Sequence, residues 1–376
     1  MIAALRRGIA AAVLMAMAAA PVRAQDSLPP TDDSIPDPEV RTDGYRGGLR
    51  LGMGGAGLAI GDVPRWTGVR INWRDERLQR VDGINVNFWR PRGDATGTVN
   101  GLALSPVAPI VSRIHGVGAG LIGVVAGERA TGLIVGGLGV VSDGPVGGIT
   151  VGGLGVVAGG DANGITIGGL GVVSDGRVRG VAVAGLGSVA QWGVSGVQVA
   201  GLGAVATGTV TGVQAAILGS IAGSDLTGVS LGGLGTISNG SARGVMIGGF
   251  GTIIGLDMTG VALGGFGVVA GGRITGAGAT LGYLRAHEGI RGIGLGGYRV
   301  RSETAHGITG AVFRVELEEL TGFSAAAWND LGVQRGLVIG IYNRARELHG
   351  VQIGLLNYAG NNRGIARLLP LVNAHF

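Results

Sequence analysis

Few side chains in this chain of 376 residues could do chemistry, and they lack the spacing of catalytic or metal-binding groups. The chain has no cysteine, which excludes disulfides, thiolate ligands and a cysteine nucleophile. Five histidines are scattered along it without metal-ligand spacing, so we expect isolated surface or packing roles. These are His115, His287, His306, His349 and His375.

Two other patterns could suggest catalysis or cofactor binding. Glu316, Glu318 and Glu319 are spaced as on a solvated strand face, which does not favour a catalytic carboxylate pair. Glycine runs such as 152–155 resemble phosphate-binding loops, but they recur along the chain and no lysine or amphipathic helix follows them. We therefore predict no enzyme activity, no cofactor, no metal and no identifiable small-molecule substrate.

One segment concentrates basic and aromatic residues. Either these side chains form cation–π pairs on a capping surface, or they contact an anionic envelope polymer or lipid headgroups. The candidate contact residues are Arg70, Trp73, Arg74, Arg77, Arg80, Trp89 and Arg90.

The composition limits the class of protein. Glycine accounts for 81 residues, charged residues for 14% and apolar residues for 46%, so the chain must bury an apolar surface without being an ordinary globular domain. The 29 basic residues, all arginine, nearly balance 24 acidic residues. This balance gives no basic stripe for nucleic acid, and we expect no nucleic-acid partner.

The N-terminal segment predicts export. Arg6 and Arg7 precede an apolar run, and Ala24 ends a small-residue cleavage pattern, so residues 1–24 are predicted to be a secretory signal peptide. Residues 25–44 are rich in proline and aspartate and predict a disordered linker.

A repeat of 16 residues dominates the sequence. A glycine recurs at this interval from Gly116 to Gly292, eleven times in succession. The residue after it, Ile149 in one unit, is β-branched in eight consecutive units, which favours strand over helix. We predict a regular array over residues 116–291, preceded by an irregular β capping segment over 45–115. Shorter units of 14–15 residues and a C-terminal cap are expected over 292–376.

The columns of the aligned units predict which side chains face inward. The consistently apolar columns are expected inside and the variable columns outside, and Leu170 is expected in an inward ladder with Leu154 and Leu186. The inward columns are headed by Ile149, Val151, Leu154, Val157 and Ala162, and the outward ones by Thr150 and Val156. Between Gly132 and Thr275 all charges fall in one five-residue window, which predicts an exposed turn.

Two all-β architectures could stack such units. The apolar columns are spaced by two, three and three residues, which implies corners and favours a glycine-rich β-solenoid with one unit per coil. The alternative is an antiparallel β-meander closed into an outer-membrane β-barrel. Asp-Gly and Asn-Gly turn pairs and the alternation ending at Phe376 support that alternative.

The last repeats resemble a known family. Gly350, Gln352, Ile353, Gly354 and Asn357 belong to the unit GVQIGLLNYA, and Gly336 to Asn343 repeat it less closely. This unit is similar to those of the bacterial surface-repeat proteins built from tandem Gly-Val-Gln-Ile-Gly-Leu-Leu-Asn-x-Ala units; the clear resemblance covers residues 336–364. It implies an exported envelope or surface protein and supplies no catalytic residues.

These observations predict an exported structural or adhesive protein of the cell envelope or surface, without catalytic activity. An envelope component or a membrane is the expected partner. The alternative function is that of an outer-membrane β-barrel, as a channel or scaffold.

Overall fold

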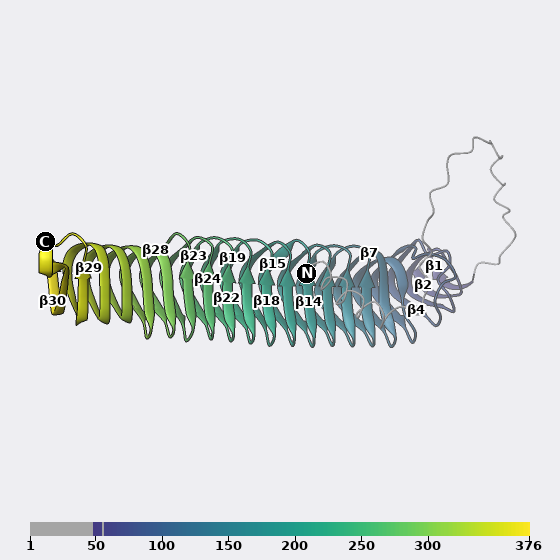
Figure 1. Cartoon of the computed structure of the whole chain (residues 1–376). Helices are drawn as coiled ribbons and strands as arrows, with labels where there is room; N and C mark the ends of the chain where they lie inside the picture. Colours follow the sequence, from purple (N-terminus) through teal and green to yellow (C-terminus); the bar gives the residue numbers. More distant parts are fainter. Residues whose placement is uncertain (1–47, 55) are drawn as a thin grey trace, which may run out of the picture.

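The computed structural model describes residues 48–54 and 56–376. The predicted signal peptide, 1–24, and the linker, 25–44, lie outside these residues. The chain winds into a long rod of stacked coils, with β1 and β2 near one end and β30 at the other (Figure 1).

Each regular coil contains one long and one short strand. In one coil these are β11 (Ala162–Gly168) and β12 (Gly171–Ser174), and they pair in parallel with β13 (Arg177–Ala184) and β14 (Gly187–Ala190) of the next coil. Paired residues of neighbouring coils are one full repeat apart in the sequence, so that Ile165 lies beside Val181. The solenoid prediction is therefore confirmed, and the regular strands do not form an antiparallel meander.

The remaining strands of the array follow the same order. The first coils comprise β1 (Leu49–Met53), β2 (Ala56–Ile60), β3 (Arg65–Asn72), β4 (Arg80–Asn87), β5 (Thr98–Ser105), β6 (Ile110–Gly120) and β7 (Gly123–Gly136). The other long strands are β9 (Val146–Gly152), β15 (Gly193–Ala200), β17 (Thr209–Ala216), β19 (Leu226–Gly232), β21 (Ala242–Gly248), β23 (Met258–Gly264), β25 (Arg273–Thr280) and β27 (Gly289–Gly296). The other short strands are β8 (Gly139–Ser142), β10 (Gly155–Ala158), β16 (Gly203–Ala206), β18 (Gly219–Ala222), β20 (Gly235–Ser238), β22 (Gly251–Ile254), β24 (Gly267–Ala270) and β26 (Tyr283–Ala286).

The ends of the rod differ from its middle. The strand β1 pairs antiparallel with β2, whereas β3 to β6 already stack in parallel, so most of the segment 45–115 continues the solenoid. At the other end β30 pairs antiparallel with the last coil of β29. The C-terminal elements are β28 (Arg299–Ala311), β29 (Arg314–Ala359), the 3-10 helix η1 (Gly364–Arg367) and β30 (Leu368–His375).

The glycine that marks each repeat is required by the backbone. Gly164 has φ of +92°, and a Cβ atom there would lie 2.3 Å from the carbonyl oxygen of Gly148 in the coil before. Among the described residues twenty stacked glycines of this kind run from Gly57 to Gly350. With about 4.8 Å between neighbouring strands, this ladder makes the rod about 90 Å long.

The predicted direction of the side chains is wrong for four of the five apolar columns. Ile149 and Leu154 are 44% and 37% exposed, whereas Thr150 and Val156 are 1% exposed each. Val151 and Val157 are only partly buried. The columns of consistent aliphatic residues therefore point outward, and the variable columns line the core.

The prediction for the fifth column, that of Ala162, is confirmed, whereas the prediction for the Leu170 ladder is not. Ala162, at 2% exposure, lies in the core as expected. Leu170, Leu154 and Leu186 lie one above the other at the corner between the long and short strands, but at 41%, 37% and 47% exposure they face outward. The prediction of an inward leucine ladder is wrong.

The small interior explains this reversal. A Cβ atom on Gly278 would lie 3.0 Å from Cδ1 of Leu284 and 3.4 Å from Cδ1 of Ile274, so a missing side chain makes room for two larger ones. Core positions vary because neighbouring side chains must complement one another in volume. In the columns of Thr150 and Val156, variation consequently marks the inside.

The charged turn lies at the surface and has a structural role. The side chain of Asp161 accepts a hydrogen bond from the backbone N–H of Arg177, one coil later, at 2.8 Å. Asp257 accepts the same bond from Arg273 at 2.8 Å. These aspartates satisfy backbone donors where the chain turns, which is a common function of aspartate side chains.

Candidate functional site

The segment predicted to contact a polymer contains a buried ion cluster. Arg70 is 0% exposed, and its guanidinium donates to Asp62 Oδ1 at 2.8 Å, to Asn85 Oδ1 at 2.7 Å and to Asp75. Its Nε donates to the carbonyl oxygen of Val63 at 2.9 Å. Arg70 therefore holds the first coils together and is not available at the surface.

The other residues of this segment are divided between ion pairs and the open surface. Arg77 pairs with Asp62 at 3.3 Å. Arg80 pairs with Asp82 at 2.8 Å, and its hydrogen bond is the main cause of the lowered pKa of that carboxyl. Arg74 is partly buried.

The aromatic side chains of this segment remain exposed. Trp73 and Trp89 are 64% and 45% exposed, and Trp73 stacks on Phe88 with ring centroids 6.1 Å apart. Arg90 is exposed beside them in sequence. Trp73, Trp89 and Arg90 can therefore be reached by a partner. Arg77 and Arg80 can be reached as well, because their side chains are 49% and 63% exposed within their ion pairs.

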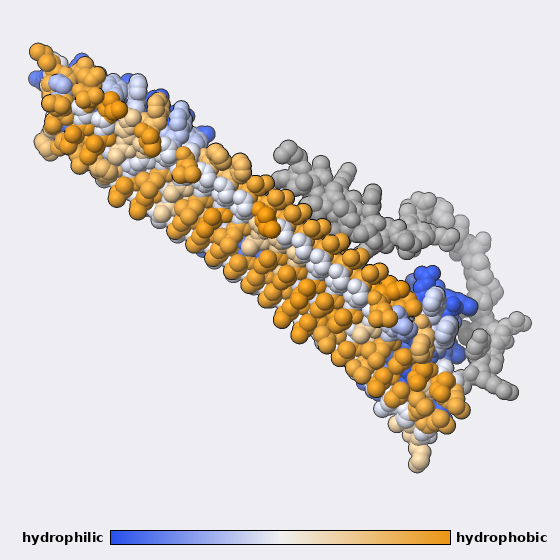
Figure 2. Space-filling view, turned by 90° about the horizontal axis from the view of Figure 1, so that it is seen from below, coloured by the Kyte–Doolittle hydropathy of each residue, from blue (hydrophilic) through white to orange (hydrophobic). Residues whose placement is uncertain are grey.

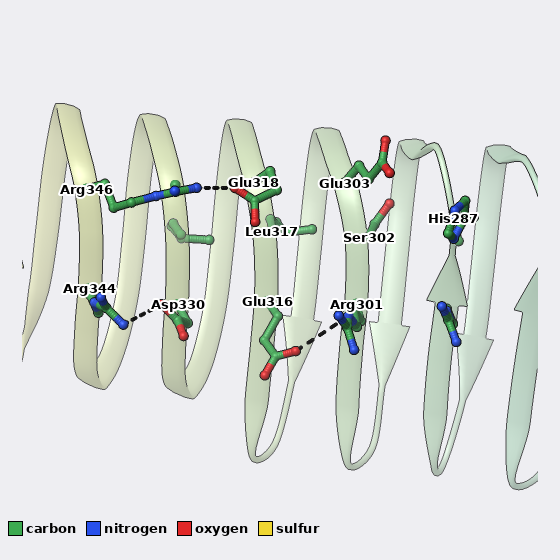
Figure 3. A pocket seen from close by; sticks show the side chains of 14 residues that line it. His287, Arg301, Ser302, Glu303, Glu316, Leu317, Glu318, Asp330, Arg344 and Arg346 are labelled. Carbon is green, nitrogen blue, oxygen red and sulfur yellow. Dashed lines mark hydrogen bonds and ion pairs between the residues drawn. The ribbon is translucent and has the colours of Figure 1, made fainter.

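A second polar feature is a groove of about 580 Å³ near the C-terminal end (Figure 3). It forms where outward columns that are apolar in the central array become charged, on β26, β28 and β29. The sequence feature that could have revealed this groove is the change from apolar to charged residues in the column of Val157, which continues as Arg285, Arg301 and Glu316. Its charged and histidine lining residues are Arg285, His287, Arg301, Glu303, Glu316, Glu318, Asp330, Arg344 and Arg346.

Most charges of the groove neutralise one another. Arg344 pairs with Asp330 at 3.6 Å, and Arg346 pairs with Glu318. Glu316 lies 3.8 Å from Arg301 and also pairs with Arg299, whose pKa it raises, chiefly through their hydrogen bond. In the part of the chain that the structure describes, no cluster of histidines and carboxylates could hold a metal ion. The groove is therefore a ladder of ion pairs between coils.

The most extensive surface feature is the apolar exterior. Figure 2 shows one side of the rod, where apolar side chains form rows along the central coils and hydrophilic side chains gather toward the ends. At the corner after each long strand, the leucine column continues into aromatic residues. The ring centroids of Phe250 and Phe266 are 5.1 Å apart with the rings tilted, and Tyr298 stacks on Phe313 with centroids 5.4 Å apart. Exposed apolar surface of this extent is typical of interaction sites.

The motif of the last repeats has a physical explanation. Gln352 is buried and donates to Oε1 of Gln334 at 2.9 Å. Asn343 donates to Oδ1 of Asn357 at 2.7 Å and accepts from Nδ2 of Asn329 at 2.8 Å. The asparagine of the motif thus belongs to an interior polar ladder of the 14-residue coils, and the glutamine is a buried side chain that pairs with Gln334.

The fold defines the chain as a parallel β-solenoid. No protein family, no curated protein and no solved structure matches the chain. No helix in the described residues is long and apolar enough to cross a membrane. The resemblance over residues 336–364 stays a prediction.

Proposed function

We propose that this chain is an exported structural or adhesive protein of the bacterial cell envelope or surface, and that it acts as a rod without catalysis. The observation that carries the proposal is the uninterrupted stack of parallel coils, about 90 Å long, with aliphatic columns on its outside. A solenoid whose coils contact only their neighbours is a natural spacer or scaffold with extended surfaces for binding.

The polar features also support a structural role. The buried charges around Arg70 and the groove charges around Glu316 are used in contacts between parts of the stack. Export is supported by Arg6, Arg7 and the apolar run that follows them.

Cell fractionation tests the location. The full chain with a C-terminal tag should appear in the envelope fraction, with residues 1–24 absent from the mature protein. A matched truncated variant, which begins with methionine followed by residue 25, should stay in the cytoplasm. Recovery of the full chain in the cytoplasm with its N-terminus intact would contradict the proposal.

The exposed aromatic and basic residues are the proposed contact with an anionic envelope polymer. The double variant Trp89→Ala/Arg90→Gln should then be released from isolated envelopes at lower salt than the parent, because the contact is electrostatic in part. The matched control is Trp192→Ala/Arg179→Gln in the central array. Equal release of both variants and the parent would remove this contact from the proposal.

A further inference from the structure

We propose that two copies of this chain associate side by side through the outward face of their long strands. This outer aliphatic face consists of two columns, which include Ile149 and Val151 in one coil and Ile165 and Ile167 in the next. The proposal concerns the folded protein alone and does not depend on where the cell places it.

The outer aliphatic face is uncharged from one end of the rod to the other. The register links its two columns coil by coil from Leu58 and Ile60 to Phe323 and Ala325, and the repeat continues them to Val351 and Ile353. Every residue in them is aliphatic, alanine, glycine or phenylalanine. The column of Val157, in contrast, becomes charged in the C-terminal coils.

The side chains of this face are open to solvent in the single chain. Ile149, Ile165 and Ile167 are 44%, 41% and 39% exposed. Val199 and Leu231 are each 37% exposed, and Ile247 is 38% exposed. Half-exposed aliphatic side chains repeated in this way present a regular ridged surface.

The area of the face matches what a stable dimer needs. A strip about 90 Å long and about 10 Å wide, the width of three residues along a strand, offers about 900 Å². Two such strips would bury about 1,800 Å², within the range of specific protein–protein interfaces, about 1,200–2,000 Å². A patch of about 900 Å² also exceeds the largest apolar patch of a typical monomer, about 300–600 Å².

A second copy fits this face better than a lipid surface does. Both rods carry ridges with the same spacing of about 4.8 Å, so their side chains can interdigitate, as they do between paired β-sheets. Proteins that lie on anionic membranes surround their apolar face with basic residues. Between Gly132 and Thr275 this chain has four arginines and five aspartates, a balance of −1.

Light scattering after size-exclusion chromatography tests the proposal. The purified chain should have the mass of a dimer at micromolar concentration and should dissociate on dilution. The double variant Val199→Arg/Leu231→Arg, which places charges on the outer aliphatic face, should raise the dissociation constant by at least about tenfold. The control Ser195→Arg/Thr227→Arg places the same charges on exposed positions of the same strands, β15 and β19, and should remain dimeric.

The dimer proposal can fail in three ways. A monomeric parent at micromolar concentration, or a face variant as dimeric as the control, would overturn the proposal. So would a parent that stays monomeric and binds vesicles of phosphatidylcholine and phosphatidylglycerol. If the arginine variant does not fold, as judged by circular dichroism, Val199→Ser/Leu231→Ser replaces it, and the unfolding temperature of the parent should rise with protein concentration.

Discussion

Gln214 donates a hydrogen bond from Nε2 to Oε1 of Gln198, directly beside it in the preceding coil, at 3.0 Å inside the core. Both side chains are 0% exposed, and Gln198 in turn donates to Ser188 Oγ at 2.9 Å. Polar side chains thus fill part of the interior while valines and isoleucines cover the outside. Buried amides are tolerated here because their N–H groups find hydrogen-bond acceptors in neighbouring coils.

The first prediction separates the corner from the core. Leu170→Asp should leave the rod folded, because this side chain faces solvent. Val172→Asp, two residues later and 0% exposed, should cost several kcal/mol, because it buries an unpaired charge. Urea unfolding followed by circular dichroism measures both. Equal destabilisation by the two changes would contradict the assigned directions.

The second prediction concerns the number of coils. Deletion of residues 196–211 removes one whole coil and brings Gly180 beside Gly212, so the protein should stay folded and protease-resistant. Deletion of residues 196–203 is the control, and it should expose the array to protease because core and turn positions no longer match. The architecture would be wrong if removing one repeat unfolded the protein and removing two did not.

The third prediction concerns the asparagine ladder of the last coils. Asn343→Ala leaves the buried amides of Asn329 and Asn357 without their shared partner. We expect a loss of about 1–3 kcal/mol in the free energy of unfolding. Arg344→Ala, at the exposed neighbouring position, is the control and should cost no more than about 1 kcal/mol. An unaffected Asn343→Ala variant would show that the ladder does not stabilise the rod.

The fourth prediction concerns the first coils. Arg70→Ala leaves Asp75 buried and unpaired, and breaking a buried pair in this way typically costs about 3–5 kcal/mol. Trp66, which packs in the same region, should report local unfolding by fluorescence. The exposed Arg90→Ala is the control. If both variants unfold at the urea concentration of the parent, the buried cluster has no role in stability.

Much of the fold could be predicted from the sequence because the repeat and its glycines reflect backbone geometry directly. The spacing of Ile149, Val151, Leu154 and Val157 indicated corners, and the confined charges indicated the turn. The direction of the side chains could not be predicted in the same way. Consistent aliphatic residues usually indicate a core, but here the interior is so small that it selects complementary volumes and leaves aliphatic ladders outside.

The candidate contact site was harder to predict than the fold. Arg70 and Arg90 look alike in a sequence, and only the coil that brings Asp62, Asp75 and Asn85 together distinguishes the buried one. The groove near Glu316 likewise depends on which residues become neighbours when the coil shortens. Contacts between coils determine which arginine is buried and which residues line the groove, and the pattern of a single sequence does not show these contacts.

The distance between spin labels along one column tests most directly that each repeat adds one coil to the rod. The chain has no cysteine, so Ser195→Cys/Thr259→Cys and Ser195→Cys/Thr321→Cys can be labelled without background. All three positions are exposed, and the pairs are four and eight coils apart. Electron–electron double resonance, with labelled protein diluted in unlabelled protein, should give about 19 Å and about 38 Å between the backbone positions. Distances that do not double from the first pair to the second would contradict the stacked rod.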